Sequence, residues 1–92
     1  MNPNILADVQ PQYSFWVCDG KVLKNMQELQ SALRQMSSET YSCHANNEKN
    51  DFANWVNDIL SDANLAQKLR SARSKQEAEK AVGNAMRTAK KK

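Results

Sequence analysis

The chain has 92 residues, of which 40% are hydrophobic and 25% are charged, and it contains two glycines and two prolines. From this length we expect one domain and no second. The composition excludes a disordered or collagen-like chain and predicts a mostly helical fold. The longest apolar run, residues 15–18, is far shorter than the roughly 20 residues that cross a bilayer, so we expect no association with a membrane.

The first residues lack the basic and apolar regions of a signal peptide, so we expect a cytoplasmic protein. Two cysteines, Cys18 and Cys43, are too few for a disulfide framework and lack the paired spacing of a zinc site. We therefore expect free thiols, although the residues alone leave a single bridge between them open.

Positive charge is concentrated at the C-terminal end. Residues 1–67 hold four basic and eight acidic residues (net −4), whereas residues 68–92 hold nine basic and two acidic residues (net +7). Such a cluster attracts phosphates or acidic surfaces, but it is equally typical of a solvated tail. The candidate nucleic-acid-binding residues are Lys68, Arg70, Arg73, Lys80, Arg87, Lys90, Lys91 and Lys92.

A short β-hairpin is predicted near the N-terminus. Residues 13–18 alternate as in a strand, with Tyr13, Phe15 and Val17 on one face. The following Asp19-Gly20 predicts a tight primed turn, because glycine accepts a positive φ, and residues 21–23 would form the returning strand. A ribbon of this size must pack on helices to be stable.

Four or five short helices are expected after the hairpin. Asn25 with Glu28 and Ser74 with Glu77 have the spacing of a capping box, and Asn50 is a further helix cap. The helices are predicted over residues 26–36, over residues 39–45, from Phe52 to Leu60, around Leu65 and Leu69, and from residue 75 onwards.

The strongest helical pattern identifies the core. Its apolar residues recur at helical spacing, and they are Phe52, Trp55, Val56, Ile59 and Leu60. Tyr41 and His44 lie one turn apart on another predicted helix. We expect both rings to close over the core helix, with the imidazole bonded to the loop of residues 46–50.

His44 is the only histidine, which excludes a two-histidine metal site within one chain, although with Cys43, Cys18, Glu48 or Asp51 it could in principle complete a mixed ligand set. Neighbouring residues of a regular helix lie about 100° apart, so we expect that Cys43 and His44 cannot face one ion or act as nucleophile and base. No glycine-rich phosphate loop is present. We therefore predict no enzymatic activity, no metal and no cofactor, and we expect neither zinc nor a chelator to change the melting temperature.

Trp16 is a candidate partner-binding residue. It lies on the strand face opposite Phe15, so the alternation predicts either that the N-terminal arm covers it or that it is exposed. Tryptophan is enriched at binding hot spots. An exposed Trp16 would therefore anchor a partner.

Part of the chain resembles a known family. The shared features are the Asp19-Gly20 turn, His44 before the loop, and the helix start Asn50-Asp51-Phe52-Ala53-Asn54-Trp55. These residues resemble a family of small prokaryotic domains of unknown function with an Asn-Asp-Phe-x-x-Trp helix start, over about residues 15–70. The resemblance implies a compact, mostly helical domain and implies no reaction.

Together these patterns predict a mainly α fold, with a short N-terminal β-hairpin packed on four to five short helices. Residues 1–12 would form a flexible arm, residues 13–89 the domain and residues 90–92 a basic tail. We expect a non-enzymatic interaction module that acts through a protein partner or self-association, with no small-molecule substrate. The alternative is sequence-independent nucleic-acid binding through the C-terminal basic helix and tail, which salt would weaken steeply.

Overall fold

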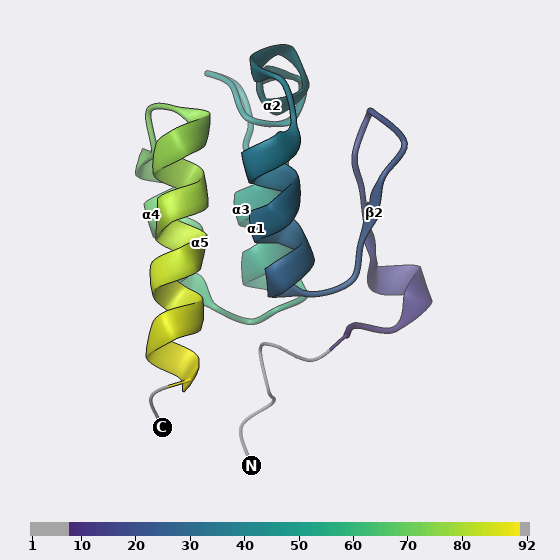
Figure 1. Ribbon diagram of the computed structural model, residues 1–92, viewed down its shortest axis with the longest axis vertical. Coiled ribbons are helices and arrows are strands. Elements are labelled where there is room, and N and C mark those ends of the chain that lie inside the picture. The colour runs from purple at the N-terminus through teal and green to yellow at the C-terminus, as the bar shows by residue number, and fades with distance from the viewer. Residues whose placement is uncertain (1–7, 91–92) are drawn as a thin grey trace.

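Helices make up most of the chain, and a two-stranded hairpin precedes them (Figure 1). The computed structural model describes the backbone of residues 8–90 and the side chains of residues 8–88. In chain order the elements are η1 (Pro11–Tyr13, a 3-10 turn), β1 (Phe15–Trp16), β2 (Val22–Leu23), α1 (Met26–Gln35), α2 (Ser38–His44), α3 (Asp51–Asp58), α4 (Ala63–Ser71) and α5 (Lys75–Lys90). The predicted mainly helical fold with a short N-terminal hairpin is confirmed.

The hairpin has one buried and one exposed face. β1 pairs antiparallel with β2, with Phe15 opposite Leu23. Phe15 and Val17 are buried and Trp16 is exposed, so the predicted alternation is confirmed within the strand. The expectation for Tyr13 is wrong, because Tyr13 ends the 3-10 turn η1 and its side chain is 49% exposed.

The hairpin loop has three residues rather than the predicted two. The Val17 carbonyl accepts a hydrogen bond from the Gly20 N–H at 2.9 Å, and the Val17 N–H donates to the Lys21 carbonyl at 2.8 Å. Gly20 has a φ of +99°, and Asp19 is not among the residues with positive φ. A two-residue primed turn of the type predicted for Asp19-Gly20 needs positive φ at both positions, whereas a three-residue loop needs it at the last only.

The helices begin at polar residues whose side chains accept hydrogen bonds from backbone N–H groups three positions on. These residues are Asn25, Ser37, Asn50, Asp62 and Ser74. At α5 the Ser74 hydroxyl accepts from the Glu77 N–H at 3.1 Å, while the Glu77 carboxylate accepts from the Arg73 N–H at 3.0 Å. The predicted caps at Asn25, Asn50 and Ser74 are confirmed.

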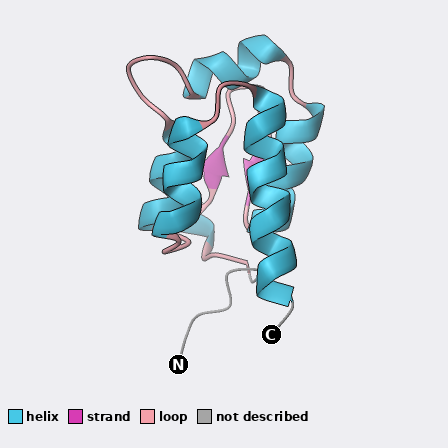
Figure 2. Cartoon of the chain, turned by 90° about the vertical axis from the view of Figure 1, so that its left-hand side faces the viewer, coloured by secondary structure: helices cyan, strands magenta, loops and turns pink. Residues whose placement is uncertain are grey.

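The hydrophobic core lies between the helices. α1 packs along α5, and α4 contacts both α3 and α5. The short helix α2 runs across one end of these helices in both views (Figures 1 and 2). The largest fully buried side chains are Phe52, Met26, Leu29, Leu33, Leu65, Leu69, Val56 and Val82.

The predicted core helix is confirmed, but it ends earlier than the apolar pattern. α3 stops at Asp58, and Ile59 is its half-buried C-terminal cap. Ser61 then has a φ of +61°, a left-handed conformation that turns the chain toward α4. Trp55 is only 7% exposed, and its Nε1–H donates to the Tyr13 carbonyl at 2.7 Å. This bond ties the start of the hairpin to the core helix.

α5 packs through small side chains. Ala78 and Val82 are buried, whereas Lys80 and Arg87 are exposed. A Cβ atom added at Gly83 would lie 2.7 Å from Gln30 Nε2, which shows how closely α5 approaches α1.

The predicted N-terminal arm, residues 1–12, lies largely outside the described residues. Of the part that is described, the Val9 N–H donates to the Lys24 carbonyl at 2.7 Å. Lys91 and Lys92 of the predicted basic tail also lie outside the described residues. Among the helices that the structure describes, none has the length and apolar character needed to cross a membrane.

Candidate functional site

His44 lies in an aromatic cluster where the hairpin, α2 and α3 meet. It is 8% exposed and is the buried polar residue of the described core. Its ring centre lies 5.2 Å from that of Phe15 and 5.3 Å from that of Phe52, both in edge-on geometry. Tyr41 stacks on Phe52 at 5.7 Å. The prediction that Tyr41 and His44 close over the core helix is therefore confirmed.

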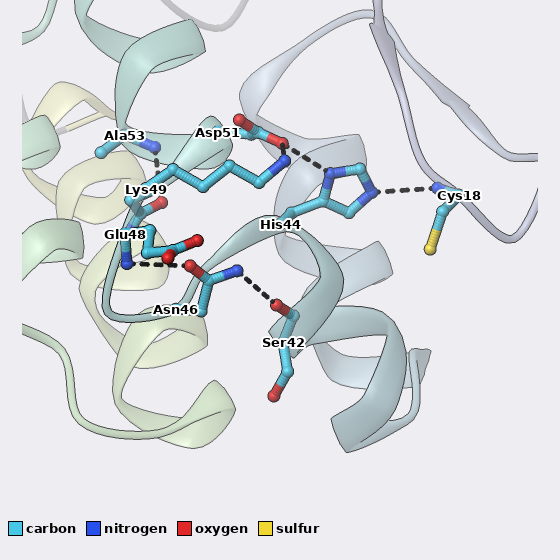
Figure 3. Close-up of polar contacts among 9 residues, drawn as sticks. Cys18, Ser42, His44, Asn46, Glu48, Lys49, Asp51 and Ala53 are labelled. Atoms are coloured by element: carbon cyan, nitrogen blue, oxygen red, sulfur yellow. Dashed lines mark hydrogen bonds and ion pairs between the residues drawn. The ribbon is translucent and has the colours of Figure 1, made fainter.

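Both imidazole nitrogens of His44 are engaged (Figure 3). Nε2 accepts a hydrogen bond from the Cys18 N–H at 3.0 Å, so Nε2 carries no proton in this arrangement. The ring proton of the neutral imidazole is then on Nδ1, which lies 3.0 Å from Asp51 Oδ2 and donates to it.

The predicted bond from the imidazole to the loop of residues 46–50 is wrong. The loop closes on itself, because the Asn46 N–H donates to the Lys49 carbonyl and Ala45 forms a β-bridge with Asn50. The first residue of α3, Asp51, is thereby brought next to the imidazole. An acidic residue in the first turn of a helix was the available sequence signal for this partner, whereas nothing in the local sequence pointed to Cys18.

Asp51 accepts from two donors. Lys49 Nζ lies 3.1 Å from the same Oδ2 atom that faces His44 (Figure 3). Burial raises the pKa of the Asp51 carboxyl, but the hydrogen bonds from His44 and Lys49 and the positive charge of Lys49 outweigh burial and hold the pKa below its ordinary value. Asp51 is therefore an ionised acceptor that orients the imidazole.

Two cysteines lie beside this imidazole. Cys18 comes from the hairpin loop and Cys43 from the last turn of α2, and both are exposed free thiols. The Cys18 sulfur, the Cys43 sulfur and a ring nitrogen of His44 all lie within 4.8 Å of one another. The expectation that Cys43 and His44 cannot face one centre is wrong, because the pair ends α2 and the hairpin loop lies against that end.

The thiols also interact with each other. A hydrogen bond with Cys43 is the largest cause that raises the pKa of the Cys18 thiol, followed by desolvation and by the negative charges of Cys43 and Asp19. A hydrogen bond with Thr40 acts in the opposite direction. The raised pKa keeps Cys18 mainly in its neutral thiol form at neutral pH.

A separate exposed feature is the outer face of the hairpin. Trp16 is 70% exposed and Tyr13 is 49% exposed, and these are the exposed large hydrophobic residues of the described chain. Of the two outcomes predicted for Trp16, exposure is confirmed for the described residues.

The basic candidate residues do not gather at one place. Arg70 and Arg73 line a polar pocket of about 940 Å³ between the loop of residues 46–50 and the start of α5. Lys68 lines a second pocket, and Lys80 and Arg87 line neither. The side chain of Lys90 and the whole of Lys91 and Lys92 lie outside the described residues.

Several polar groups in the larger pocket are already paired. Arg70 donates to Asn54 Oδ1 at 3.1 Å, and Lys75 Nζ donates to the Leu33 carbonyl at 3.1 Å. Arg73 forms no ion pair with any residue that the structure describes. Arg73 is thus the cation of this pocket that is best placed to receive an external anion.

No family model, curated protein or solved structure matches this chain. The resemblance to the small prokaryotic domain family therefore stays a prediction.

Proposed function

We propose that this domain is a non-enzymatic interaction module that binds a protein partner through the outer face of its hairpin. The observation that supports the proposal is the exposure of Trp16, a residue that is 70% exposed. Exposing a large aromatic side chain forgoes the favourable burial of its apolar surface, and tryptophan dominates binding energy when a partner covers it.

The hairpin presents Trp16 rigidly. Its strand neighbours Phe15 and Val17 are buried, so the backbone on either side is anchored in the core. Tyr13, three residues earlier at the end of η1, is also exposed, and its carbonyl accepts a hydrogen bond from the Trp55 indole N–H. A preorganised aromatic side chain loses little conformational entropy on binding, which favours an interface at this face.

Trp16→Ala tests this function, with Gln67→Ala on the exposed side of α4 as the matched control. We first measure the mass of the parent protein by sedimentation over a range of concentrations, which detects self-association. Immobilised parent and variants are then compared for the proteins that they retain after nuclease treatment. In both comparisons the free energy of unfolding is also measured. Trp16→Ala should change it by no more than about 0.5 kcal/mol.

The expected result is a partner or a second copy that binds the parent and Gln67→Ala, and binds Trp16→Ala at least about tenfold more weakly. Equal binding by the parent and Trp16→Ala would contradict the proposal. So would a monomeric parent that retains nothing.

A second candidate function is sequence-independent binding of nucleic acid. The observation that favours it is that Arg70 and Arg73 line one polar pocket, with Arg73 unpaired among the described residues. Cationic side chains bind phosphates by releasing counterions. No aromatic residue follows Trp55 in the chain, and Tyr41, which also lines this pocket, is half-buried and stacked on Phe52.

A further inference from the structure

We propose that Cys18, Cys43 and His44 form a binding site for a borderline-soft divalent metal ion such as Zn²⁺. Two thiol sulfurs and one imidazole nitrogen lie within 4.8 Å of one another. Thiolate and imidazole are the ligands that zinc prefers, and three protein ligands leave a fourth coordination position for water or an external group.

The fold assembles these ligands from two distant segments. The hydrogen bond from the Cys18 N–H to His44 Nε2 holds the hairpin loop against the last turn of α2. Phe15 and Phe52 pack against the imidazole and fix its ring. Because both cysteines are exposed and His44 is buried beneath them, an ion can enter from solvent.

The spacing is close to what a tetrahedral centre needs. With Zn–S bonds of about 2.3 Å and Zn–N bonds of about 2.0–2.1 Å, tetrahedral geometry separates the ligand atoms by about 3.5–3.8 Å. Ligand atoms within 4.8 Å must therefore close by at most about 1.3 Å. Rotation of the two exposed cysteine side chains brings the sulfurs closer, and the hairpin-loop backbone must also shift, because the Cys18 N–H lies 3.0 Å from Nε2.

Asp51 prepares the imidazole for the ion. Asp51 Oδ2 accepts a hydrogen bond from Nδ1–H at 3.0 Å. The proton is thereby kept on Nδ1, and the lone pair of Nε2 faces the backbone N–H of Cys18 (Figure 3). A carboxylate on the far nitrogen of a ligating histidine is the usual outer partner at zinc sites. The ion would replace the Cys18 N–H at Nε2, and the two thiols would release their protons to solvent as they bind it. Asp51 is thus a positioning residue for the site.

This proposal replaces the sequence-based expectation of no metal. That expectation assumed that Cys43 and His44 stay on different sides of a regular helix. The pair instead terminates α2, where the third ligand arrives from the hairpin. The site is independent of the protein-binding face proposed above, since it does not use the Trp16 side chain.

The test is a titration of the reduced full-length chain with Co²⁺, followed by displacement with Zn²⁺. We expect sulfur-to-cobalt charge-transfer absorption that saturates at one equivalent. Cys18→Ser and Cys43→Ser should each remove most of this absorption and weaken Zn²⁺ binding at least about tenfold. Circular dichroism checks that both variants fold, which the exposure of both cysteines leads us to expect.

Three further measurements distinguish direct binding of the metal by these residues from an effect of the substitutions on the fold. Asp51→Asn should weaken Zn²⁺ about 10–100-fold while keeping the charge-transfer bands. In the unmodified protein, the ¹⁵N shift of His44 Nε2 should move on adding Zn²⁺ while Nδ1 stays protonated. Ser42→Ala, beside the site, and Trp16→Ala should both bind as the parent does, so a failure of the protein-binding proposal leaves this one unaffected.

The proposal would be overturned by a parent protein without charge-transfer bands, or by a cysteine variant that binds like the parent. An unmoved Nε2 signal would also overturn it. A Cys18–Cys43 disulfide that persists under reducing conditions and blocks Co²⁺ would assign the pair to a covalent bridge instead.

Discussion

His44 Nε2 accepts a hydrogen bond from the backbone N–H of Cys18 at 3.0 Å, joining residues 26 positions apart. The same ring donates a hydrogen bond from Nδ1–H to Asp51 Oδ2, with 3.0 Å between the nitrogen and the oxygen. One side chain therefore links the hairpin, the end of α2 and the start of α3 (Figure 3). The neutral tautomer that satisfies both bonds is the form in which the hairpin is held.

Asp51→Asn should make the free energy of unfolding depend less on pH in the acidic range. The pKa of the Asp51 carboxyl is below its ordinary value in the folded protein, so its ionised form stabilises the fold above about pH 4, and this contribution is lost as the pH falls through the folded pKa. We expect the variant to be about 1 kcal/mol less stable at pH 7, with the difference shrinking below about pH 4.

Urea denaturation across this pH range measures the effect, with Asp58→Asn at the exposed end of α3 as the control. A difference between parent and Asp51→Asn that stays constant down to pH 3 would contradict the assignment of Asp51 as an ionised acceptor.

Trp55→Ala should lower the free energy of unfolding by about 3–5 kcal/mol, because it removes a nearly buried indole and its bond to the Tyr13 carbonyl. Trp16→Ala removes the same side chain from an exposed position and should cost no more than about 0.5 kcal/mol. Chemical denaturation of the two variants decides the matter. A loss below about 1 kcal/mol for Trp55→Ala would contradict the burial of Trp55 in the core.

Gly20→Ala should cost about 1–2 kcal/mol, although an added methyl group meets no atom within 4 Å. The cost comes from the backbone, since Gly20 has a φ of +99°. Ser61 is a residue other than glycine that has a positive φ, +61°, a conformation that glycine adopts more easily. Ser61→Gly should therefore leave the free energy of unfolding unchanged or raise it by up to about 1 kcal/mol. Thermal unfolding compares the pair, and an equal loss in both would refute this explanation.

Gly83→Ala tests the close approach of α5 to α1. Alanine favours a helix over glycine by about 0.8–1.0 kcal/mol, but its Cβ would press on the Gln30 amide, which bonds Glu79. The single variant should therefore gain only part of this energy. Gln30→Ala removes the obstacle, so the substitution should gain the full amount in that background. A double-mutant cycle that shows no coupling between the two positions would argue against the contact.

Binding to random duplex DNA or RNA should fall as salt rises if the basic end contacts phosphates, with a log–log slope of about −0.9 per phosphate neutralised on DNA. Removing Lys90–Lys92 and replacing Arg87 with glutamine should flatten the slope, and stability should change by no more than about 0.5 kcal/mol. Arg73→Gln tests the pocket in the same assay. A parent protein that binds neither nucleic acid at low salt would exclude this function.

The residues themselves determined most of the local structure. The caps at Asn25, Asn50 and Ser74, the core face of α3 and the position of the hairpin turn were predictable. Each depends on hydrogen bonds or side-chain periodicity within a few neighbouring positions. The type of hairpin loop was not, since the local sequence does not specify whether Cys18 or Val17 pairs with Lys21, or whether Asp19 joins Gly20 in positive φ.

The surroundings of His44 depend on contacts between segments that are far apart in the sequence. Sequence reasoning placed Cys43 and His44 on different sides of a helix and assigned the imidazole to the wrong partner. The tautomer depends on Cys18 and Asp51, and the sulfur–nitrogen cluster depends on where the hairpin loop meets the end of α2. These contacts join segments that are brought together by burying Phe15 and Phe52 against each other. Hydrophobic burial is non-directional, so local sequence does not specify which polar groups it brings into contact.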